Sequence, residues 1–211
     1  MVHLERLNVE NNRLEKLPKG LAKLPNLLEL DLARNRLEGE FPSEGFAKLE
    51  WLDISNNKVT TLPKLTTWKN IKSFWALSNQ IKTVPVEFCQ SRLDTVNLSS
   101  NQITELPDEF GDLPLISLWL SENRFTEFPL CLTRLRRLGT MDLAQNQIQT
   151  IPETISTCRY LACLELGNNR LTGLPKNIKK LKHLRRFNIS DNAVTQFPVG
   201  NKPIYIFPFY R

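Results

Sequence analysis

The 211-residue sequence has no long hydrophobic run and no secretory signal. A helix that crosses a bilayer needs about 18 or more consecutive apolar residues, and no run approaches that length. The N-terminal stretch MVHLERLNVE alternates apolar and charged residues, so it has neither the basic region nor the apolar core of a signal peptide. We therefore expect a cytoplasmic globular protein with no membrane span.

Catalytic and metal-binding patterns are also missing. The sequence has two histidines, His3 and His183, and no glycine-rich phosphate loop or nucleophile elbow. The four cysteines are scattered, which favours reduced thiols over a disulfide framework; they are Cys89, Cys131, Cys158 and Cys163. We expect a protein that is not an enzyme and that has no cofactor and no metal site.

What the sequence does contain is a repeat of 22 or 23 residues. Each unit reads L-x-x-L-x-L-x-x-N-x-L, as within LPLISLWLSENRF and LACLELGNNRL. The L-x-L alternation predicts a short strand with one buried face. Self-similarity at this period is typical of a solenoid. The predicted fold is an α/β repeat solenoid with nine repeats over residues 1–200.

Every unit carries an asparagine just after its predicted strand. A side-chain amide can both donate to and accept from backbone groups that a bend leaves unpaired. Stacked along a solenoid, these amides are expected to form a structural ladder. Its members are Asn12, Asn35, Asn57, Asn79, Asn101, Asn123, Asn146, Asn169 and Asn192.

A weaker apolar pattern, L-P-x-x-L-x-x-L, follows in segments such as LPKGLAKL and LPKNIKKL. Proline cannot continue a strand, and it suits the first turn of a helix. The pattern therefore predicts short helical or irregular segments on the outer side of the solenoid. Trp68 and Cys158 occupy apolar positions of these segments, which indicates packing in the core.

Nine concordant units of this kind resemble the leucine-rich repeat family over essentially the whole chain. The L-P form is similar to the intracellular repeats of Scribble, Erbin, Ras suppressor protein and plant Ras-group relatives. One unit, NRLEGEFPSEGF, inserts Gly39-Glu40 and is similar to a plant-specific variant. The resemblance implies a horseshoe with a parallel sheet on its concave side. It also implies a scaffold or interaction module in intracellular signalling.

One position of each predicted strand points outward onto the concave face. In chain order it holds Asn8, Asp31, Asp53, Trp75, Asn97, Trp119, Asp142, Glu165 and Asn188. Because parallel strands lie about 4.8 Å apart, we expect the rings of Trp75 and Trp119 to stand roughly 10 Å apart and to flank a slot over Asn97. Trp51 is expected nearby on the diagonal. The alternative is that the aromatic rings stack on their neighbours and stiffen the sheet.

Acids flank the tryptophans in the same column, although the chain as a whole has a formal net charge of +6. Much of the positive charge lies in the outer segments, so an acidic concave strip is expected to steer a cationic partner inward. The expected partner is a protein or peptide with a cationic or aromatic anchor; arginine suits both tryptophan and carboxylate. The expected binding residues are Trp51, Trp75, Asn97, Trp119, Asp31, Asp53, Asp142 and Glu165.

Two other functions stay open. The stretch KNIKKLKHLRR, residues 176–186, has six cations and suits nucleic acid or an anionic membrane. A solvated outer face explains it more simply, and the aromatic residues typical of single-strand binding are missing, which argues against nucleic acid. The chain is also consistent with the recognition domain of a longer enzyme.

The two ends of the repeat array differ from its middle. In the tail, Ile204, Phe207 and Tyr210 continue the apolar register of the last full unit. Residues 201–211 are therefore expected to form an incomplete tenth repeat or a C-terminal cap. A solenoid without caps exposes its apolar core at each end, so end-to-end self-association is a further possibility.

Overall fold

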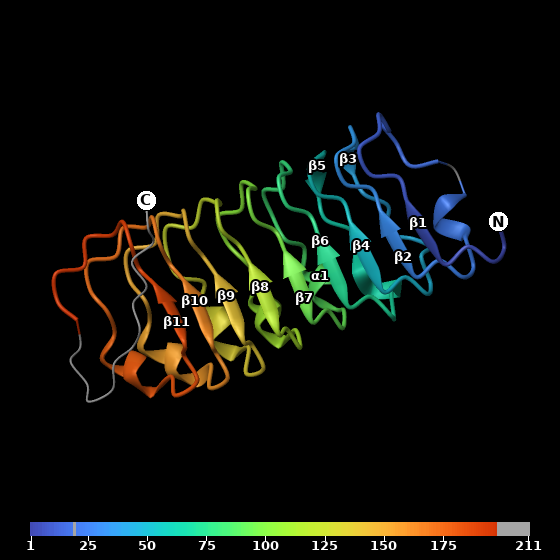
Figure 1. Cartoon of the computed structure of the whole chain (residues 1–211). Coiled ribbons are helices and arrows are strands. Elements are labelled where there is room, and N and C mark those ends of the chain that lie inside the picture. Colours follow the sequence, from blue (N-terminus) through green and yellow to red (C-terminus); the bar gives the residue numbers. More distant parts are fainter. Residues whose placement is uncertain (19, 198–211) are drawn as a thin grey trace.

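The computed structural model describes residues 1–18 and 20–197. Each coil of the chain contributes one short strand to a single parallel sheet (Figure 1). The nine strands, in sheet order, are β1 (Arg6–Asn8), β2 (Glu29–Asp31), β4 (Trp51–Asp53), β6 (Ser73–Trp75), β7 (Thr95–Asn97), β8 (Ser117–Trp119), β9 (Thr140–Asp142), β10 (Cys163–Glu165) and β11 (Arg186–Asn188). This confirms the predicted α/β solenoid. The expected tenth repeat, 201–211, lies outside the described residues.

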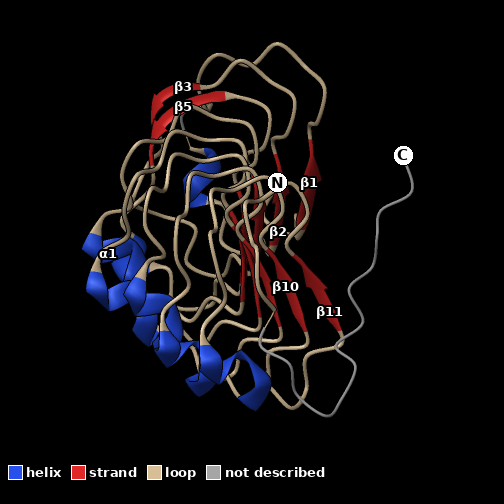
Figure 2. Cartoon of the chain, turned by 90° about the vertical axis from the view of Figure 1, so that its left-hand side faces the viewer, coloured by secondary structure: helices blue, strands red, loops and turns tan. Residues whose placement is uncertain are grey.

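Short helices lie on the side of the molecule opposite the sheet (Figure 2). They are η1 (Leu21–Lys23), η2 (Leu65–Thr67), α1 (Val86–Cys89), η3 (Asp108–Asp112), η4 (Leu130–Arg134), η5 (Glu153–Thr157) and η6 (Lys176–Lys180). Proline precedes the last five of these in sequence, with φ between −63° and −70°. Since this φ is built into proline and its ring has no N–H to leave unpaired, proline starts the outer turn as the sequence predicts.

The inserted unit forms a second, two-stranded parallel sheet from β3 (Glu38–Glu40) and β5 (Lys58–Thr61). Gly39 has a φ of +77°, a conformation that costs glycine little. The strand register shifts between Gly39 and Glu40. The additional residues therefore pair as a strand on the far side of the molecule from the nine-stranded sheet (Figure 2).

The core is a set of apolar rows that run along the solenoid. The row behind the middle of the sheet is 0–1% exposed and consists of Leu30, Leu52, Phe74, Val96, Leu118, Met141, Leu164 and Phe187. Burial of each such side chain contributes about 1.5–3 kcal/mol. Trp68 and Cys158 are buried as expected, and the indole N–H of Trp68 donates to the Ser43 carbonyl at 3.0 Å.

Eight of the nine ladder asparagines each bond two successive loops. The Oδ1 of Asn101 accepts the Ile81 N–H at 3.0 Å, and its Nδ2 donates to the Ala76 carbonyl at 2.9 Å, both in the preceding repeat. The same Nδ2 lies 3.0 Å from the carbonyls of Leu98 and Ser99 in its own loop. Equivalent bonds to the preceding repeat are made by Asn35, Asn57, Asn79, Asn123, Asn146, Asn169 and Asn192.

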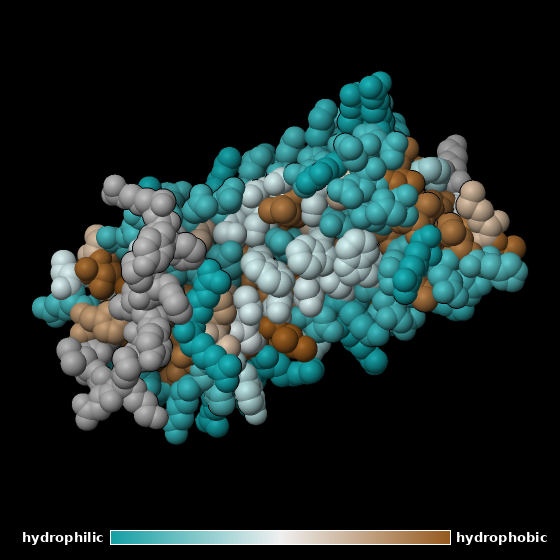
Figure 3. Space-filling view, viewed as in Figure 1, coloured by the Kyte–Doolittle hydropathy of each residue, from teal (hydrophilic) through white to brown (hydrophobic). Residues whose placement is uncertain are grey.

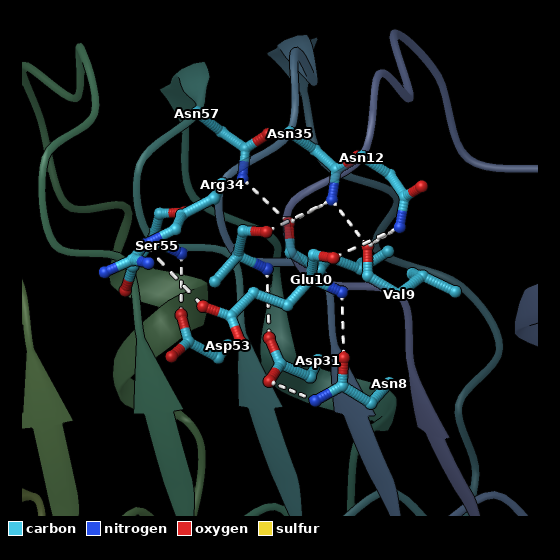
Figure 4. Close-up of polar contacts among 12 residues, drawn as sticks. Asn8, Val9, Glu10, Asn12, Asp31, Arg34, Asn35, Asp53, Ser55 and Asn57 are labelled. Atoms are coloured by element: carbon cyan, nitrogen blue, oxygen red, sulfur yellow. Dashed lines mark hydrogen bonds and ion pairs between the residues drawn. The ribbon is translucent and has the colours of Figure 1, made fainter.

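Asn12, in the first repeat, bonds only carbonyls of its own loop, those of Val9 and Glu10 (Figure 4). The residue before each ladder asparagine has a positive φ between 52° and 57°. Such a conformation costs a residue other than glycine about 1 kcal/mol or more. The asparagine bonds offset this cost, because they pair backbone groups that a buried bend would otherwise leave unsatisfied.

Candidate functional site

The outward side chains of the nine strands form two columns, which together we call the sheet face. The strand register aligns the central column as Asn8, Asp31, Asp53, Trp75, Asn97, Trp119, Asp142, Glu165 and Asn188. The neighbouring column contains Arg6, Glu29, Trp51, Ser73, Thr95, Ser117, Thr140, Cys163 and Arg186.

Most of the central column has a structural role. In six repeats the Oδ1 of an Asp or Asn accepts the backbone N–H two residues later, at 2.7–3.0 Å. This Asx turn ends the strand and begins the bend. The residues are Asn8, Asp31, Asp53, Asn97, Asp142 and Asn188, the first three of which are drawn in Figure 4. In the sequence, the signal for this role is the interchange of Asp and Asn at one repeat position.

Trp75 and Trp119 occupy this Asx position and have no side-chain oxygen to supply the bond. After Trp75 the N–H of Leu77 donates instead to Ser55 Oγ of the preceding repeat, at 3.2 Å. Neither indole can supply the strand-ending bond, so their place on the sheet face needs another explanation.

The rings of Trp75 and Trp119 stack on each other, with centroids 5.5 Å apart and an interplanar angle of 28°. The expected 10 Å slot is therefore wrong. Asn97, on the strand between them, is only 8% exposed because its side chain turns back to the Ser99 N–H, so the long indoles lean together over it. The Nε1 of Trp75 donates to Ser73 Oγ at 2.9 Å, which holds that ring in place.

Further apolar side chains lie around the stacked pair. Trp51 is half-buried on β4 and pairs in register with Ser73. Leu77, just after β6, is half-buried, and Ile116, just before β8, is 42% exposed. Figure 3 shows a pale patch with brown spots over the middle of the sheet. The sequence indicates both residues by their distance from an outward tryptophan. Leu77 lies two residues after Trp75, and Ile116 lies three residues before Trp119.

Asp53 and Asp142 flank the stacked pair in the central column, next to Trp75 and Trp119 respectively. Burial raises the pKa of both carboxyl groups, and the hydrogen bonds that they accept offset this only in part. The structure therefore places a partly buried acid on each side of the aromatic pair.

The two acids further out in the central column, Glu165 and Asp31, have polar partners within the protein. Glu165 forms an ion pair of 2.5 Å with Arg186, and Asp31 accepts a hydrogen bond of 3.0 Å from Asn8 Nδ2. Of the residues expected to bind a partner, five lie on consecutive strands: Asp53, Trp75, Asn97, Trp119 and Asp142. Trp51 adjoins them, and Asp31 and Glu165 lie one strand further out on either side.

Residues 1–18 and 20–197 show no arrangement that suggests metal chemistry. Within these ranges no three His, Cys, Asp or Glu side chains are grouped so that they could hold a metal ion. The same ranges contain no helix with the length and apolar character needed to cross a bilayer. Burial raises the pKa of the half-buried Cys163 thiol to about 11, so this thiol is not poised as a nucleophile.

Comparison with protein families identifies the repeat. Residues 2–59 match a family model described as leucine rich repeat, and residues 92–113 match a second model with the same description. Of the nine-stranded sheet, the two matched ranges contain the strands β1, β2, β4 and β7. These models therefore recognise the same strand-and-bend unit that the structure repeats along the chain.

Curated relatives match shorter segments. The volume-regulated anion channel subunit LRRC8D of Rattus norvegicus is 31% identical over 90 residues, covering 41% of this chain and 10% of that protein. Podocan-like protein 1 of Homo sapiens is 42% identical over 65 residues, covering 28% and 13%. Leucine-rich repeat serine/threonine-protein kinase 1 of Mus musculus is 31% identical over 90 residues, covering 39% and 4%. The matches thus span 4–13% of these relatives.

Solved structures match nearly the whole chain. A leucine-rich repeat protein of Leptospira interrogans has a TM-score of 0.74 at 32% identity and covers 90% of this chain and 56% of its own. The Arabidopsis receptor kinase HAESA, solved with the peptide hormone IDA and the co-receptor SERK1, has 0.77 at 28%, covering 89% and 34%. The plant peptide hormone receptor RGFR1, in complex with RGF2, has 0.72 at 27%, covering 90% and 36%.

Proposed function

Because the chain is a leucine-rich repeat protein, we propose that it is a non-enzymatic interaction module whose sheet face binds a protein or peptide partner. The observation that carries the proposal is the stacked pair of Trp75 and Trp119, displayed where six other repeats place a strand-ending Asx. We assign the module to residues 1–200 as nine repeats.

The stacked pair has the physical properties of a binding hot spot. Tryptophan is enriched among the residues that contribute most to protein interfaces. Here the stacking and the bond from Trp75 to Ser73 already restrict ring movement, so a partner has little side-chain entropy left to remove. The half-buried Trp51 and Leu77 extend the apolar area around the pair.

The acids beside the pair define the chemistry of the partner. Asp53 and Asp142 lie at the two sides of the rings, so a cationic anchor can stack on an exposed indole face and reach a carboxylate. Arginine fits this geometry because its planar guanidinium stacks and donates at the same time. The anchor lies on top of the aromatic pair, since the closed stack leaves no room between the rings. The complexes of the similar receptors HAESA, with the peptide hormone IDA, and RGFR1, with RGF2, support a peptide as partner.

We propose that the module works in the cytoplasm, in signalling. The support is that all four cysteines are unpaired thiols in the structure, as in reducing compartments.

A recognition domain within a longer kinase is the second candidate, favoured by relatives such as leucine-rich repeat serine/threonine-protein kinase 1. The reading frame that follows Arg211 tests this candidate directly.

The proposal is tested by capturing partners from a cell extract on the immobilised chain and titrating the recovered partner. Trp75→Ala and Trp119→Ala are expected to weaken binding by about 2 kcal/mol or more, which is roughly 30-fold. Tyr160→Ala is the matched control, because Tyr160 is an exposed aromatic residue outside the two columns of the sheet face. Thermal melts verify that each variant is folded. Wild-type affinity in both folded tryptophan variants would overturn the proposal.

A further inference from the structure

A second surface, opposite the sheet face, is strongly basic. It consists of η4, η5 and η6 with the turns that follow them, residues 130–137, 153–160 and 176–183, and we call it the basic flank (Figure 2). These segments hold eight lysines and arginines and one acid. Neighbouring residues 104–112, which include η3, hold four acids and no cation. The positive charge is therefore gathered on one part of the outer side.

Seven cations of the basic flank have no ion pair among the described residues. The acid of the flank, Glu153, accepts the backbone N–H groups of Lys176 and Asn177 at 2.9 Å and 2.8 Å. The Glu153 carboxylate therefore binds the backbone at the start of η6 and, within the described ranges, forms no ion pair with a cation of the flank. The seven exposed cations are Arg136, Arg137, Arg159, Lys176, Lys179, Lys180 and Lys182.

The basic flank also contains a cleft of about 520 Å³. Three arginines line it together with Asp112 and three threonines: Arg134, Arg136, Arg137, Thr133, Thr154 and Thr157. Arg134 is fixed, because it donates to the Asp108 carbonyl and pairs with Asp112. Arg136 and Arg137 have no such partner in the described residues. Paired guanidinium groups beside a cleft suit a phosphate headgroup, whose oxygens accept two parallel N–H bonds.

Two exposed apolar side chains stand among these cations. Leu130 begins η4 and is 65% exposed, and Tyr160 follows Arg159 and is 64% exposed. The tyrosine ring stacks on His183, with centroids 5.9 Å apart. Tyrosine favours the boundary between water and lipid, and apolar side chains beside cations strengthen binding to anionic bilayers. A nucleic-acid backbone offers no comparable site for a leucine.

We propose that the basic flank docks the protein on an anionic bilayer, with a lipid phosphate in the arginine cleft and Leu130 and Tyr160 at the membrane interface. The sheet face lies on the opposite side (Figure 2), so the docked protein keeps it free. This surface is independent of the partner site on the sheet face.

The test is co-sedimentation of the whole chain with vesicles of phosphatidylcholine alone or mixed with phosphatidylserine. We expect binding to the mixed vesicles and none to phosphatidylcholine. The triple change Lys179→Glu, Lys180→Glu and Lys182→Glu should lower the partition coefficient about tenfold or more, since each cation near the surface adds to the attraction. The matched triple Lys58→Glu, Lys69→Glu and Lys82→Glu makes the same charge change away from the flank, and should stay within about threefold of the parent.

Two further arms separate the explanations. Salt weakens only the charge contribution, whereas Leu130→Ser with Tyr160→Ser removes the apolar one, so this double change should lower binding to the mixed vesicles at every salt concentration. If the two lysine triples lowered the partition coefficient equally, the effect would depend on net charge alone and the proposal would be overturned. Equal binding to vesicles with and without phosphatidylserine would also overturn it. If single- or double-stranded DNA at equal phosphate concentration displaces the protein from vesicles, the flank is a nucleic-acid site instead.

Discussion

The indole rings of Trp75 and Trp119 stack across an intervening strand, over the largely buried side chain of Asn97. This side-chain contact links β6 directly to β8, over the strand β7 that lies between them. The two rings form one aromatic body on the sheet face. Their contribution to the fold can be measured separately from their proposed contribution to binding.

The stack predicts an energetic coupling between the two tryptophans. Aromatic pairs in this geometry contribute about 0.5–1.5 kcal/mol beyond area burial. Denaturant unfolding of Trp75→Ala, Trp119→Ala and the double variant should give a coupling energy in that range from the mutant cycle. Rings 10 Å apart, as expected from strand spacing alone, would give additive changes, and so additivity would contradict the stack.

Loss of a central ladder asparagine should destabilise the fold. Asn101→Ala and Asn123→Ala each leave buried backbone groups of two repeats without partners, which costs about 1–3 kcal/mol. Equilibrium denaturation measures the change in unfolding free energy. Asn12→Ala is the internal control, since Asn12 bonds only its own exposed loop. Equal effects at all three positions would show that the bonds to the preceding repeat contribute nothing.

Asp53→Asn should stabilise the protein at neutral pH by up to about 1 kcal/mol. Asparagine keeps the bond to the Ser55 N–H, as Asn97 does at its own position, and it removes a charge that burial disfavours. Because burial raises the pKa of Asp53 above 3.8, the folded state binds its proton more readily than the unfolded state, and stability is lost as pH rises through this pKa.

The gain from Asp53→Asn should therefore disappear well below pH 3.8, where Asp53 is protonated in both states. Thermal melts of parent and variant across this pH range measure it. Asp53→Ala separates the two contributions, since it removes the charge and the Asx bond together. A gain that persists at acid pH would show that the buried charge is not its cause.

The thiols should resist alkylation in the folded protein. Burial raises the pKa of Cys89 to about 12 and that of Cys131, Cys158 and Cys163 to about 11. Against an ordinary thiol, this lowers the thiolate fraction at pH 8 by about 100-fold or more. Iodoacetamide labelling followed by mass spectrometry should be slow at the half-buried Cys163 and fast after denaturation. Rapid native labelling of Cys163 would contradict the raised pKa.

The sequence predicts the backbone and the core of this molecule well because both follow the repeat period. The alignment of Leu52, Phe74 and Val96 in one buried row is a consequence of units that differ in length by at most one residue. The asparagine positions follow for the same reason. Each of these features depends on spacing along the chain, which can be counted directly.

The candidate site is less predictable because it depends on side-chain torsions and on pairing between repeats. Strand spacing places the Cα atoms of Trp75 and Trp119, but their long side chains decide where the rings meet. The ion pair between Glu165 and Arg186 likewise depends on rotamers. The structural role of the acids is hard to predict for a different reason: aspartate at this position ends the strand in an Asx turn, and asparagine does so equally well.

The asparagine ladder has a direction. Each amide from Asn35 onward bonds the loop of the repeat before it. A ribosome delivers the N-terminal repeats first, so the newest coil on the nascent chain always carries backbone groups whose partner has not yet been synthesised. Each coil is completed by the coil made after it.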